Sequence, residues 1–386
     1  MPLVQPQSEP ENLLEYSVVY TDRALNHMSK RFQGVMKDIS RILKSVYNGA
    51  AAIIVPGNGT IGMEAVARQF ANDKKCLVIR NGWFSFRWSQ ILETGKIASE
   101  TTVMMAWRQG DDPCAPFSPP PLEKVVARIH AEKPDVVFVP HVETASGMIL
   151  PNDYLQEVGH AVRAVDGLFV LDCIASGAIW VDMLACDVDV LISAPQKGWS
   201  GSPCCALVVL GERARSRIEN TQSNSFACDL KKWLRIMEAF ENGGHAYHAT
   251  MPTDTLAALR DVMRETENYG FERVRREQNE LGVRVRALFA SRGFKSVAAE
   301  GFQAPGVVVS YTDDPEIQSG RKFLAVGLQI AAGVPLQCNE GEDFRTFRVG
   351  LFGLEKWHNP DRTVLTLADA LDALARGNAV NTDSST

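Results

Sequence analysis

The chain has 386 residues, of which 45% are hydrophobic and 22% are charged, a composition typical of a globular protein with two or three domains. Its formal net charge of -6 and the lack of an apolar run of roughly 20 residues predict neither nucleic acid nor a membrane as a partner. The eight cysteines are scattered and include no C-x-x-C pair, which predicts reduced thiols and no metal site. The N-terminal segment is polar and acidic and does not resemble a signal peptide, so we expect a cytoplasmic location.

Short apolar runs alternate with helical patterns over the first two thirds of the chain. The runs predict seven strands, at Ala51–Val55, Cys76–Arg80, Thr101–Ala106, Asp135–Pro140, Gly167–Asp172, Asp189–Ala194 and Cys205–Leu210. Helical patterns between them, such as Met63–Asn72 and Asn152–Val165, indicate an α/β fold with a mostly parallel sheet flanked by helices. Only about ten residues separate the last two runs, too few for a parallel crossover, so we expect one antiparallel strand.

The remainder of the chain predicts a smaller unit. A long helical pattern after Pro252 keeps Val274, Leu281 and Val285 on one face, and the short strands Gly306–Tyr311 and Thr346–Leu351 follow. The predicted domains are an N-terminal arm at 1–20, a large domain at 21–255, a smaller C-terminal α+β domain at 256–377 and a disordered tail at 378–386.

Two of the predicted strands end in groups of opposite charge. Gly167–Asp172 ends in a carboxylate, and Pro195, Gln196 and Lys197 directly follow Asp189–Ala194. In an open α/β sheet, ligands bind outside the carboxyl ends of the strands. An amine that can form a Schiff base and an anion that can pair with a pyridine nitrogen together indicate a site for pyridoxal phosphate.

A glycine-rich turn follows the first strand. Gly57 to Gly62 read GNGTIG and open a helix, which matches the G-x-G-x-x-G pattern of dinucleotide-binding proteins. The next strand ends in Arg80 and lacks the expected acid, although an arginine there is compatible with NADP. A helix N-terminus binds any phosphate, so we expect a phosphate site and keep an NADP-dependent oxidoreductase as an alternative.

Eight motifs in order give the chain a specific resemblance. They are HMSKRF, PGNGTIGMEA, RNGWFSFRW, HVETASGMILP, LFVLDCIASG, LISAPQKGWSG, YHATMPT and FRVGLFG. The chain resembles the class V aminotransferases of fold type I, in particular the alanine–glyoxylate and serine–pyruvate group, over roughly residues 27 to 375. The resemblance implies pyridoxal 5'-phosphate as cofactor and ping-pong transamination between a small amino acid and a 2-oxo acid such as glyoxylate or pyruvate.

The resemblance assigns five residues to the reacting part of the cofactor. Lys197 would form the Schiff base and shuttle the proton, and Asp172 would pair with the protonated pyridine nitrogen. Phe84 would stack on the ring, Ile174 would press on its opposite face, and Thr144 would reach its phenolic oxygen.

Further residues are assigned to the phosphate, the substrate and the partner subunit. Asn58, Gly59, Thr60 and Gln196 would bind the phosphate, together with Tyr247 and Thr250 from the neighbouring subunit of a homodimer. Arg348 would bind the substrate carboxylate through its bidentate fork, with Arg345 as a second candidate.

Some positions depart from the family pattern and leave other functions open. The usual Pro-Gly-Pro segment near the start is replaced by LLEYSVVYTDRALNHMS, which suggests Tyr16, Tyr20 and Arg23 as parts of the substrate wall, and Trp83 and Trp88 suggest a reshaped pocket.

The alternatives that keep the fold are a β-lyase or desulfurase that uses Cys338, and a non-catalytic regulator. The non-catalytic regulator is disfavoured, because the chain keeps the full set of family residues Lys197, Asp172 and Arg348.

Overall fold

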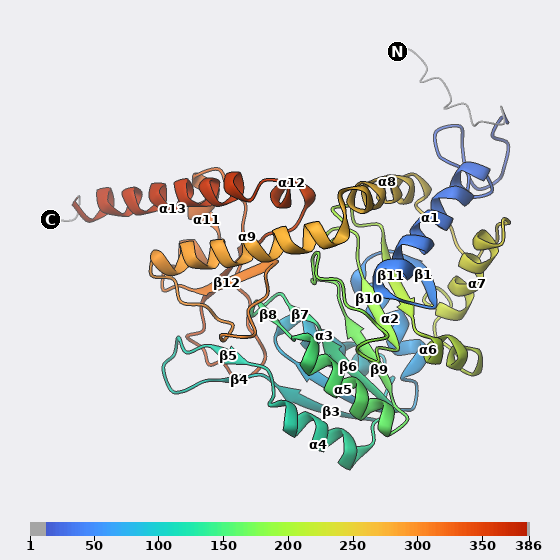
Figure 1. Ribbon diagram of the computed structural model, residues 1–386, viewed down its shortest axis with the longest axis horizontal. Helices are drawn as coiled ribbons and strands as arrows, with labels where there is room; N and C mark the ends of the chain where they lie inside the picture. The colour runs from blue at the N-terminus through green and yellow to red at the C-terminus, as the bar shows by residue number, and fades with distance from the viewer. Residues whose placement is uncertain (1–12, 384–386) are drawn as a thin grey trace.

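The computed structural model describes residues 13–383, and residues 1–12 and 384–386 lie outside this part. A large sheet flanked by helices fills one part of the molecule, and the long helix α9 leads to a smaller part that carries the C-terminus (Figure 1). The predicted arm at 1–20 therefore falls mostly outside the described residues, and residues 13–20 form neither helix nor strand.

Seven strands form the large sheet, in agreement with the prediction. They are β1 (Ala51–Pro56), β2 (Lys75–Arg80), β3 (Glu100–Met105), β6 (Val136–Pro140), β9 (Leu168–Asp172), β10 (Val190–Ser193) and β11 (Cys205–Leu210). Their order is β1-β11-β10-β9-β6-β2-β3, and the run from β10 to β3 is parallel. The predicted antiparallel strand is β11, which is antiparallel to both β1 and β10.

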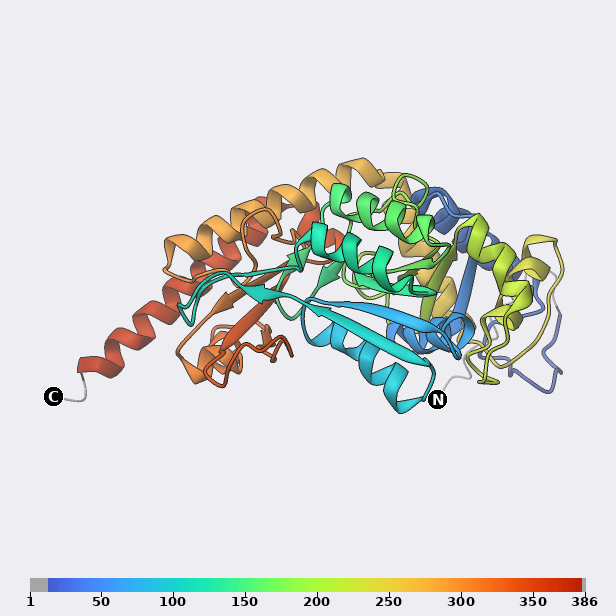
Figure 2. The same ribbon diagram turned by 90° about the horizontal axis from the view of Figure 1, so that it is seen from below.

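Helices cover both faces of this sheet. They are α1 (Lys30–Tyr47), α2 (Gly59–Phe70), α3 (Trp83–Thr94), α4 (Leu122–Glu132), α5 (Asn152–Ala164), α6 (Glu212–Arg217), the 3-10 turn η1 (Ile218–Asn220), α7 (Leu230–Glu241) and α8 (Thr253–Tyr269). Figure 2 shows α3 on one face and α4 and α5 on the other, so the sheet is the middle of three layers. This double cover explains why the inner strands, such as β6, β9 and β11, are buried along their whole length, whereas the edge strand β3 is more polar and partly exposed.

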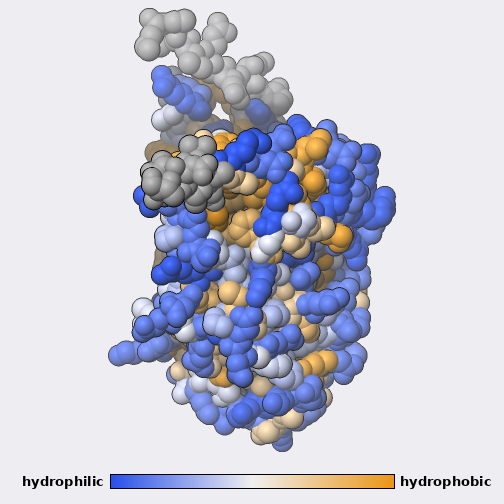
Figure 3. All heavy atoms as spheres, turned by 90° about the vertical axis from the view of Figure 1, so that its left-hand side faces the viewer, coloured by the Kyte–Doolittle hydropathy of each residue, from blue (hydrophilic) through white to orange (hydrophobic). Residues whose placement is uncertain are grey.

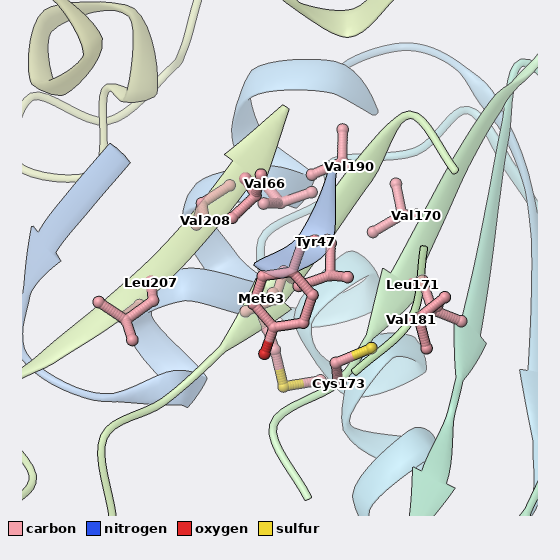
Figure 4. Close-up of a cluster of buried hydrophobic side chains, with 14 of the residues drawn as sticks. Tyr47, Met63, Val66, Val170, Leu171, Cys173, Val181, Val190, Leu207 and Val208 are labelled. Atoms are coloured by element: carbon pink, nitrogen blue, oxygen red, sulfur yellow. The ribbon is translucent and has the colours of Figure 1, made fainter. Parts of the chain in front are cut away.

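The core lies between the sheet and these helices. Figure 4 shows Tyr47 of α1 and Met63 of α2 beside apolar side chains of β9, β10 and β11. Tyr47 is 1% exposed and Leu171 is fully buried. Complete burial of one such side chain stabilises the fold by about 1.5–3 kcal/mol, so this packing holds the strand ends in place.

The smaller part combines helices with a three-stranded antiparallel sheet. Its elements are α9 (Phe271–Ser291), β12 (Val307–Tyr311), α10 (Pro315–Gln318), α11 (Arg321–Ala325), β13 (Ala331–Ala332), β14 (Thr346–Gly350), α12 (Leu354–Trp357) and α13 (Pro360–Asp383). The sheet order β12-β14-β13 places β14 in the centre. Two short ribbons pair β4 (Trp107–Arg108) with β5 (Phe117–Ser118) and β7 (Val142–Glu143) with β8 (Met148–Ile149).

Two predicted boundaries differ from the structure. The boundary at residues 255 and 256 falls inside α8, which is tied to α1 by the Arg41–Glu267 and Arg260–Asp38 ion pairs. We therefore place the passage to the smaller part at Gly270, between α8 and α9. Residues 378–383 belong to helix α13, where the polar sequence had predicted a disordered tail.

The surface of the smaller part is largely hydrophilic on the side seen in Figure 3. Within residues 13–383, no helix is both long and apolar enough to cross a membrane.

Candidate active site

A cavity of about 360 Å³ lies at the carboxyl ends of the parallel strands. The structure brings nine of the predicted residues onto its wall, namely Asn58, Gly59, Thr60, Phe84, Thr144, Asp172, Ile174, Gln196 and Lys197. The register of the sheet brings these residues together. Asp172 at the end of β9 pairs with Pro140 of β6 and with Ile192 of β10, so the three strands end at the same edge of the sheet. Segments more than a hundred residues apart in the sequence therefore share one rim.

The glycine-rich turn between β1 and α2 forms one wall of the cavity. Asn58 caps α2, since its side chain accepts a hydrogen bond from the Ile61 backbone at 3.2 Å. Gly57 has φ 129°, a conformation that favours glycine. A Cβ atom on Gly59 would lie 2.7 Å from Ile174 Cδ1, so the turn approaches the opposite wall as closely as glycine permits.

Asp172 is a buried carboxyl group. Its Oδ1 accepts a hydrogen bond from the Ile174 backbone at 3.0 Å, and the side chain points into the cavity wall. Burial raises the pKa of Asp172 to about 7, against the smaller opposing effect of that hydrogen bond. A cationic partner brought into the cavity would replace the lost hydration and favour the carboxylate.

Lys197 presents its amine to the same cavity. Burial lowers the pKa of Lys197, and the nearby positive charge of Arg348 lowers it further. The Lys197 Nζ atom lies 5.0 Å from the centre of the Phe352 ring, and no ion pair joins it to a carboxylate among the described residues. The environment therefore makes the Lys197 ammonium easier to deprotonate than an exposed lysine, which suits a nucleophilic amine.

Arg348 approaches the cavity from the smaller part. It lies in the central strand β14, its Nε donates to the Ala332 carbonyl at 2.8 Å, and its guanidinium carbon lies 5.5 Å from the centre of the Phe84 ring. Burial lowers the pKa of Arg348. Arg345, the second candidate, is exposed and lines a separate surface groove with Asp313. The structure favours Arg348 as the cation next to the cavity.

Tyr247 and Thr250 do not line the cavity of their own chain. Their hydroxyl groups lie 3.0 Å apart, and Tyr247 is 55% exposed. The Tyr247 ring also contacts His27, with the ring centres 5.6 Å apart.

Glu143, which was not among the predicted site residues, organises the start of α3. This carboxylate is 1% exposed and accepts hydrogen bonds from the backbones of Phe84, Ser85 and Ala145 and from the Ser85 hydroxyl, at 2.6–3.2 Å. It therefore fixes the backbone that carries Phe84. The available signal was an acid in the otherwise apolar segment HVETASG.

Arg87 also lines the cavity and was not among the predicted site residues. It follows Phe84 by three residues, a spacing that places both side chains on one side of α3.

The tryptophans do not shape this cavity in the way the sequence suggested. Trp88 is fully buried and stacks on Phe138 with ring centres 4.4 Å apart, so it belongs to the core beneath α3. Trp83 contacts Phe86 and is absent from the cavity wall. Of the N-terminal candidates, Tyr20 donates to the Met251 carbonyl at 3.3 Å and also lies outside the wall.

Two alternative functions lose their structural basis. Burial raises the pKa of Cys338 to about 12, and its Sγ lies 3.4 Å from the Arg80 carbonyl, so the thiol is neither ionised nor accessible as a nucleophile. The glycine-rich turn follows β1, an edge strand with an antiparallel neighbour. A dinucleotide-binding turn follows a strand inside a parallel sheet, so the dinucleotide interpretation was wrong.

The donor set of the cavity fits pyridoxal phosphate. The N-terminus of α2, the Thr60 hydroxyl and the Gln196 amide suit a phosphate, and the close approach of Gly59 to Ile174 leaves a narrow slot. Phe84 supplies an aromatic face, while Asp172 and Lys197 supply the acid and the amine that the ring requires.

Comparison with known proteins identifies the family of the chain. Residues 9–325 match the family described as "Aminotransferase class-V". A 2-aminoethylphosphonate–pyruvate transaminase from Salmonella paratyphi C is 25% identical over 330 residues, 82% of this chain and 84% of that protein.

Two solved structures share the fold. The alanine–glyoxylate aminotransferase from Nostoc sp. has a TM-score of 0.75 at 22% identity and covers 91% of this chain and 89% of its own. The ureidoglycine–glyoxylate aminotransferase from Bacillus subtilis has a TM-score of 0.73 at 23% identity and covers 89% and 84%. With the family match spanning most of its length, the chain belongs to the class V aminotransferases and is a pyridoxal-phosphate-dependent enzyme.

Proposed function

We propose that this enzyme transfers the amino group of a small amino acid, of the alanine or serine type, to a 2-oxo acid such as glyoxylate or pyruvate. The observation that carries the proposal is the meeting of Lys197 and Asp172 on one cavity wall with Arg348 beside it. The Arg348 guanidinium, which lies beside the cavity on the side of the smaller part, suits one α-carboxylate. The relatives' names support the acceptor, since each includes pyruvate or glyoxylate.

Each residue has a distinct role in this reaction. When bound, pyridoxal phosphate accepts the amino group and stabilises negative charge at the substrate Cα. Lys197 anchors the cofactor, and its Nζ takes the proton from Cα and returns it elsewhere on the reacting system. Asp172 keeps a proton on the pyridine nitrogen, which maintains the ring as an electron acceptor. Arg348 orients the substrate through its carboxylate.

The remaining cofactor contacts position the ring and its phosphate. Phe84 and Ile174 would hold the two faces of the ring, and Thr144 would contact its phenolic oxygen, since all three line the cavity. Asn58, Gly59, Thr60 and Gln196, also on the wall, would bind the phosphate.

We further propose a homodimer in which Tyr247 and Thr250 complete the phosphate site of the partner subunit. In support, both residues lie outside their own cavity, and Tyr247 is half exposed. The neighbouring Phe226 is 69% exposed and contacts His248, so apolar surface accompanies this loop. The cytoplasmic location stays a prediction.

Visible absorption of the purified enzyme tests the reaction. We expect a yellow band that L-alanine or L-serine bleaches and that glyoxylate or pyruvate restores, because the two half-reactions are separable. A panel that includes 2-aminoethylphosphonate as donor defines the substrate. If only that donor bleaches the band, the proposed donor class is wrong; if no donor does, transamination of small amino acids is excluded.

A further inference from the structure

Arg87 places a permanent positive charge at the phosphate end of the cavity. Its Nη1 donates to the Thr60 hydroxyl at 2.9 Å, and its guanidinium carbon lies 5.2 Å from the centre of the Phe84 ring. It thereby joins the first turn of α2 to the helix that carries the stacking residue.

Arg87 is half-buried, yet its hydrogen-bond partner is a hydroxyl group and not a carboxylate. Among residues 13–383, no ion pair joins its guanidinium to an acid, and the Thr60 hydroxyl is the acceptor that the structure shows. A guanidinium has five N–H donors, so most of them remain available to an anion. Arg87 and Lys197 are the basic side chains on the described cavity wall. The proposed function assigns Lys197 to the Schiff base, which leaves Arg87 for the phosphate.

Thr60 links this cation to the expected phosphate. A hydroxyl that accepts a hydrogen bond from Arg87 keeps its own proton for another acceptor. Thr60 is also the second residue of α2, where backbone N–H groups point out of the helix. Backbone donors, a hydroxyl donor and a guanidinium therefore converge at the first turn of α2, an arrangement that suits a phosphate. The positive charge of Arg87 also acts on Asp172, where it lowers the pKa of the carboxyl group against the larger effect of burial.

We propose that Arg87 is the cationic residue of the cofactor phosphate site: it orients the Thr60 hydroxyl toward the phosphate and neutralises the phosphate charge. This inference rests on the proposed function, because it requires the cofactor phosphate to lie at Asn58–Thr60. It assigns to α3 a second role besides carrying Phe84.

Binding to the cofactor-free enzyme tests the proposal without relying on turnover. Dissociation constants are measured for pyridoxal phosphate, for pyridoxal and for inorganic phosphate, by fluorescence quenching and calorimetry. In Arg87→Gln, we expect pyridoxal phosphate to bind about 10- to 100-fold more weakly, with pyridoxal unchanged and phosphate binding lost. Arg87→Lys should recover part of the affinity, and Thr60→Val should show a smaller loss. Arg235→Gln, at an exposed site on α7, is the matched control.

Several outcomes would overturn the proposal. If Arg87→Gln weakens the binding of pyridoxal and of pyridoxal phosphate equally, Arg87 only stabilises the contact between α2 and α3. If the affinities for all three ligands are unchanged, Arg87 does not take part in phosphate binding. If Arg87→Gln fails to fold, Arg87→Lys and Thr60→Val decide by the same comparison of ligands. A wild-type enzyme that binds phosphate but not pyridoxal phosphate would contradict the proposed function alone, and one that binds neither would contradict both.

Discussion

Asp172 and Lys197 are both shifted toward their neutral forms by the same physical cause. Burial raises the pKa of Asp172 and lowers the pKa of Lys197, because low polarity disfavours each charged form. Without cofactor, neither group has the environment that its charged form needs. A protonated ring nitrogen next to Asp172 supplies the missing countercharge, so cofactor binding and carboxylate ionisation should be coupled.

The first residue-scale prediction concerns the stability of the cofactor-free enzyme. An unfolded Asp172 has lost its proton above about pH 4, whereas the folded one keeps it until about pH 7. The folded state therefore binds more protons in this window, and the free energy of unfolding should fall as pH rises, by at most about 1.4 kcal/mol per pH unit.

Asparagine cannot ionise, so Asp172→Asn should lack this part of the decline. Urea unfolding of both cofactor-free proteins between about pH 4 and pH 7 measures the difference. Parallel pH dependence of the two proteins would show that Asp172 ionises normally in the folded state.

The second prediction concerns the reactivity of Lys197. Arg348→Leu removes the positive charge that lowers the pKa of Lys197, so this pKa should rise while the larger effect of burial remains. The pH profile for the rate at which pyridoxal phosphate combines with the cofactor-free enzyme should move to higher pH. Stopped-flow absorbance records it. Arg345→Leu, an exposed neighbour, is the control, and an equal shift there would contradict a local effect of Arg348.

At the scale of single elements, the N-terminus of α3 depends on a residue from a distant segment. Glu143 lies in the β7–β8 ribbon, yet it accepts the hydrogen bonds of Phe84 and Ser85 at the start of α3. A carboxylate at a helix N-terminus also interacts favourably with the helix dipole. The position of Phe84 on the cavity wall is therefore fixed by tertiary structure.

Removal of this carboxylate should destabilise the fold. In Glu143→Ala, the buried donors of Phe84, Ser85 and Ala145 lose their acceptor, so we expect the free energy of unfolding to fall by about 2–4 kcal/mol. Thermal or urea unfolding measures the change. Glu93→Ala, at an exposed site of the same helix, should change it by less than about 0.5 kcal/mol. A similar effect of the two substitutions would mean that helix propensity outweighs the buried contacts.

At the scale of the whole molecule, the proposed sharing of sites predicts complementation between inactive variants. Lys197→Ala lacks its anchor, and a Tyr247→Phe, Thr250→Ala double variant damages the site of its partner. In a mixed dimer, the double-variant subunit keeps Lys197 and receives intact Tyr247 and Thr250 from the other subunit. Random mixing after dissociation should restore about a quarter of the wild-type activity. Activity that never exceeds the sum of the two separate variants would place both hydroxyl groups in their own subunit's function.

Much of the fold was predictable because local patterns report it directly. The seven apolar runs correspond to the seven strands, since a sheet covered on both faces requires such runs. The short connection into Cys205–Leu210 also correctly indicated the antiparallel strand. The boundary between the two parts was not predictable. The helical pattern after Pro252 is continuous, and nothing in it shows that α8 packs on α1 of the large part.

The nine residues on the cavity wall were predictable by a different route, the order and spacing of motifs. Arg87 and Glu143 were missed because nothing local distinguishes a cavity arginine from a solvated one, or a buried acid from a turn residue. Trp88 was misplaced for the same reason, since its side of α3 faces Phe138 of the core.

The strands, their alternation with helices and the chemical groups at the strand ends follow from the amino-acid sequence, because they depend on short-range hydrophobic patterns and residue identity. Which of those groups meet depends on the three-dimensional packing of the chain. Sheet register aligned Asp172 with the neighbouring strand ends, β14 carried Arg348 to Phe84, and the first turn of α2 met Arg87 of α3. These meetings depend on packing between segments far apart in the chain, which no local pattern encodes.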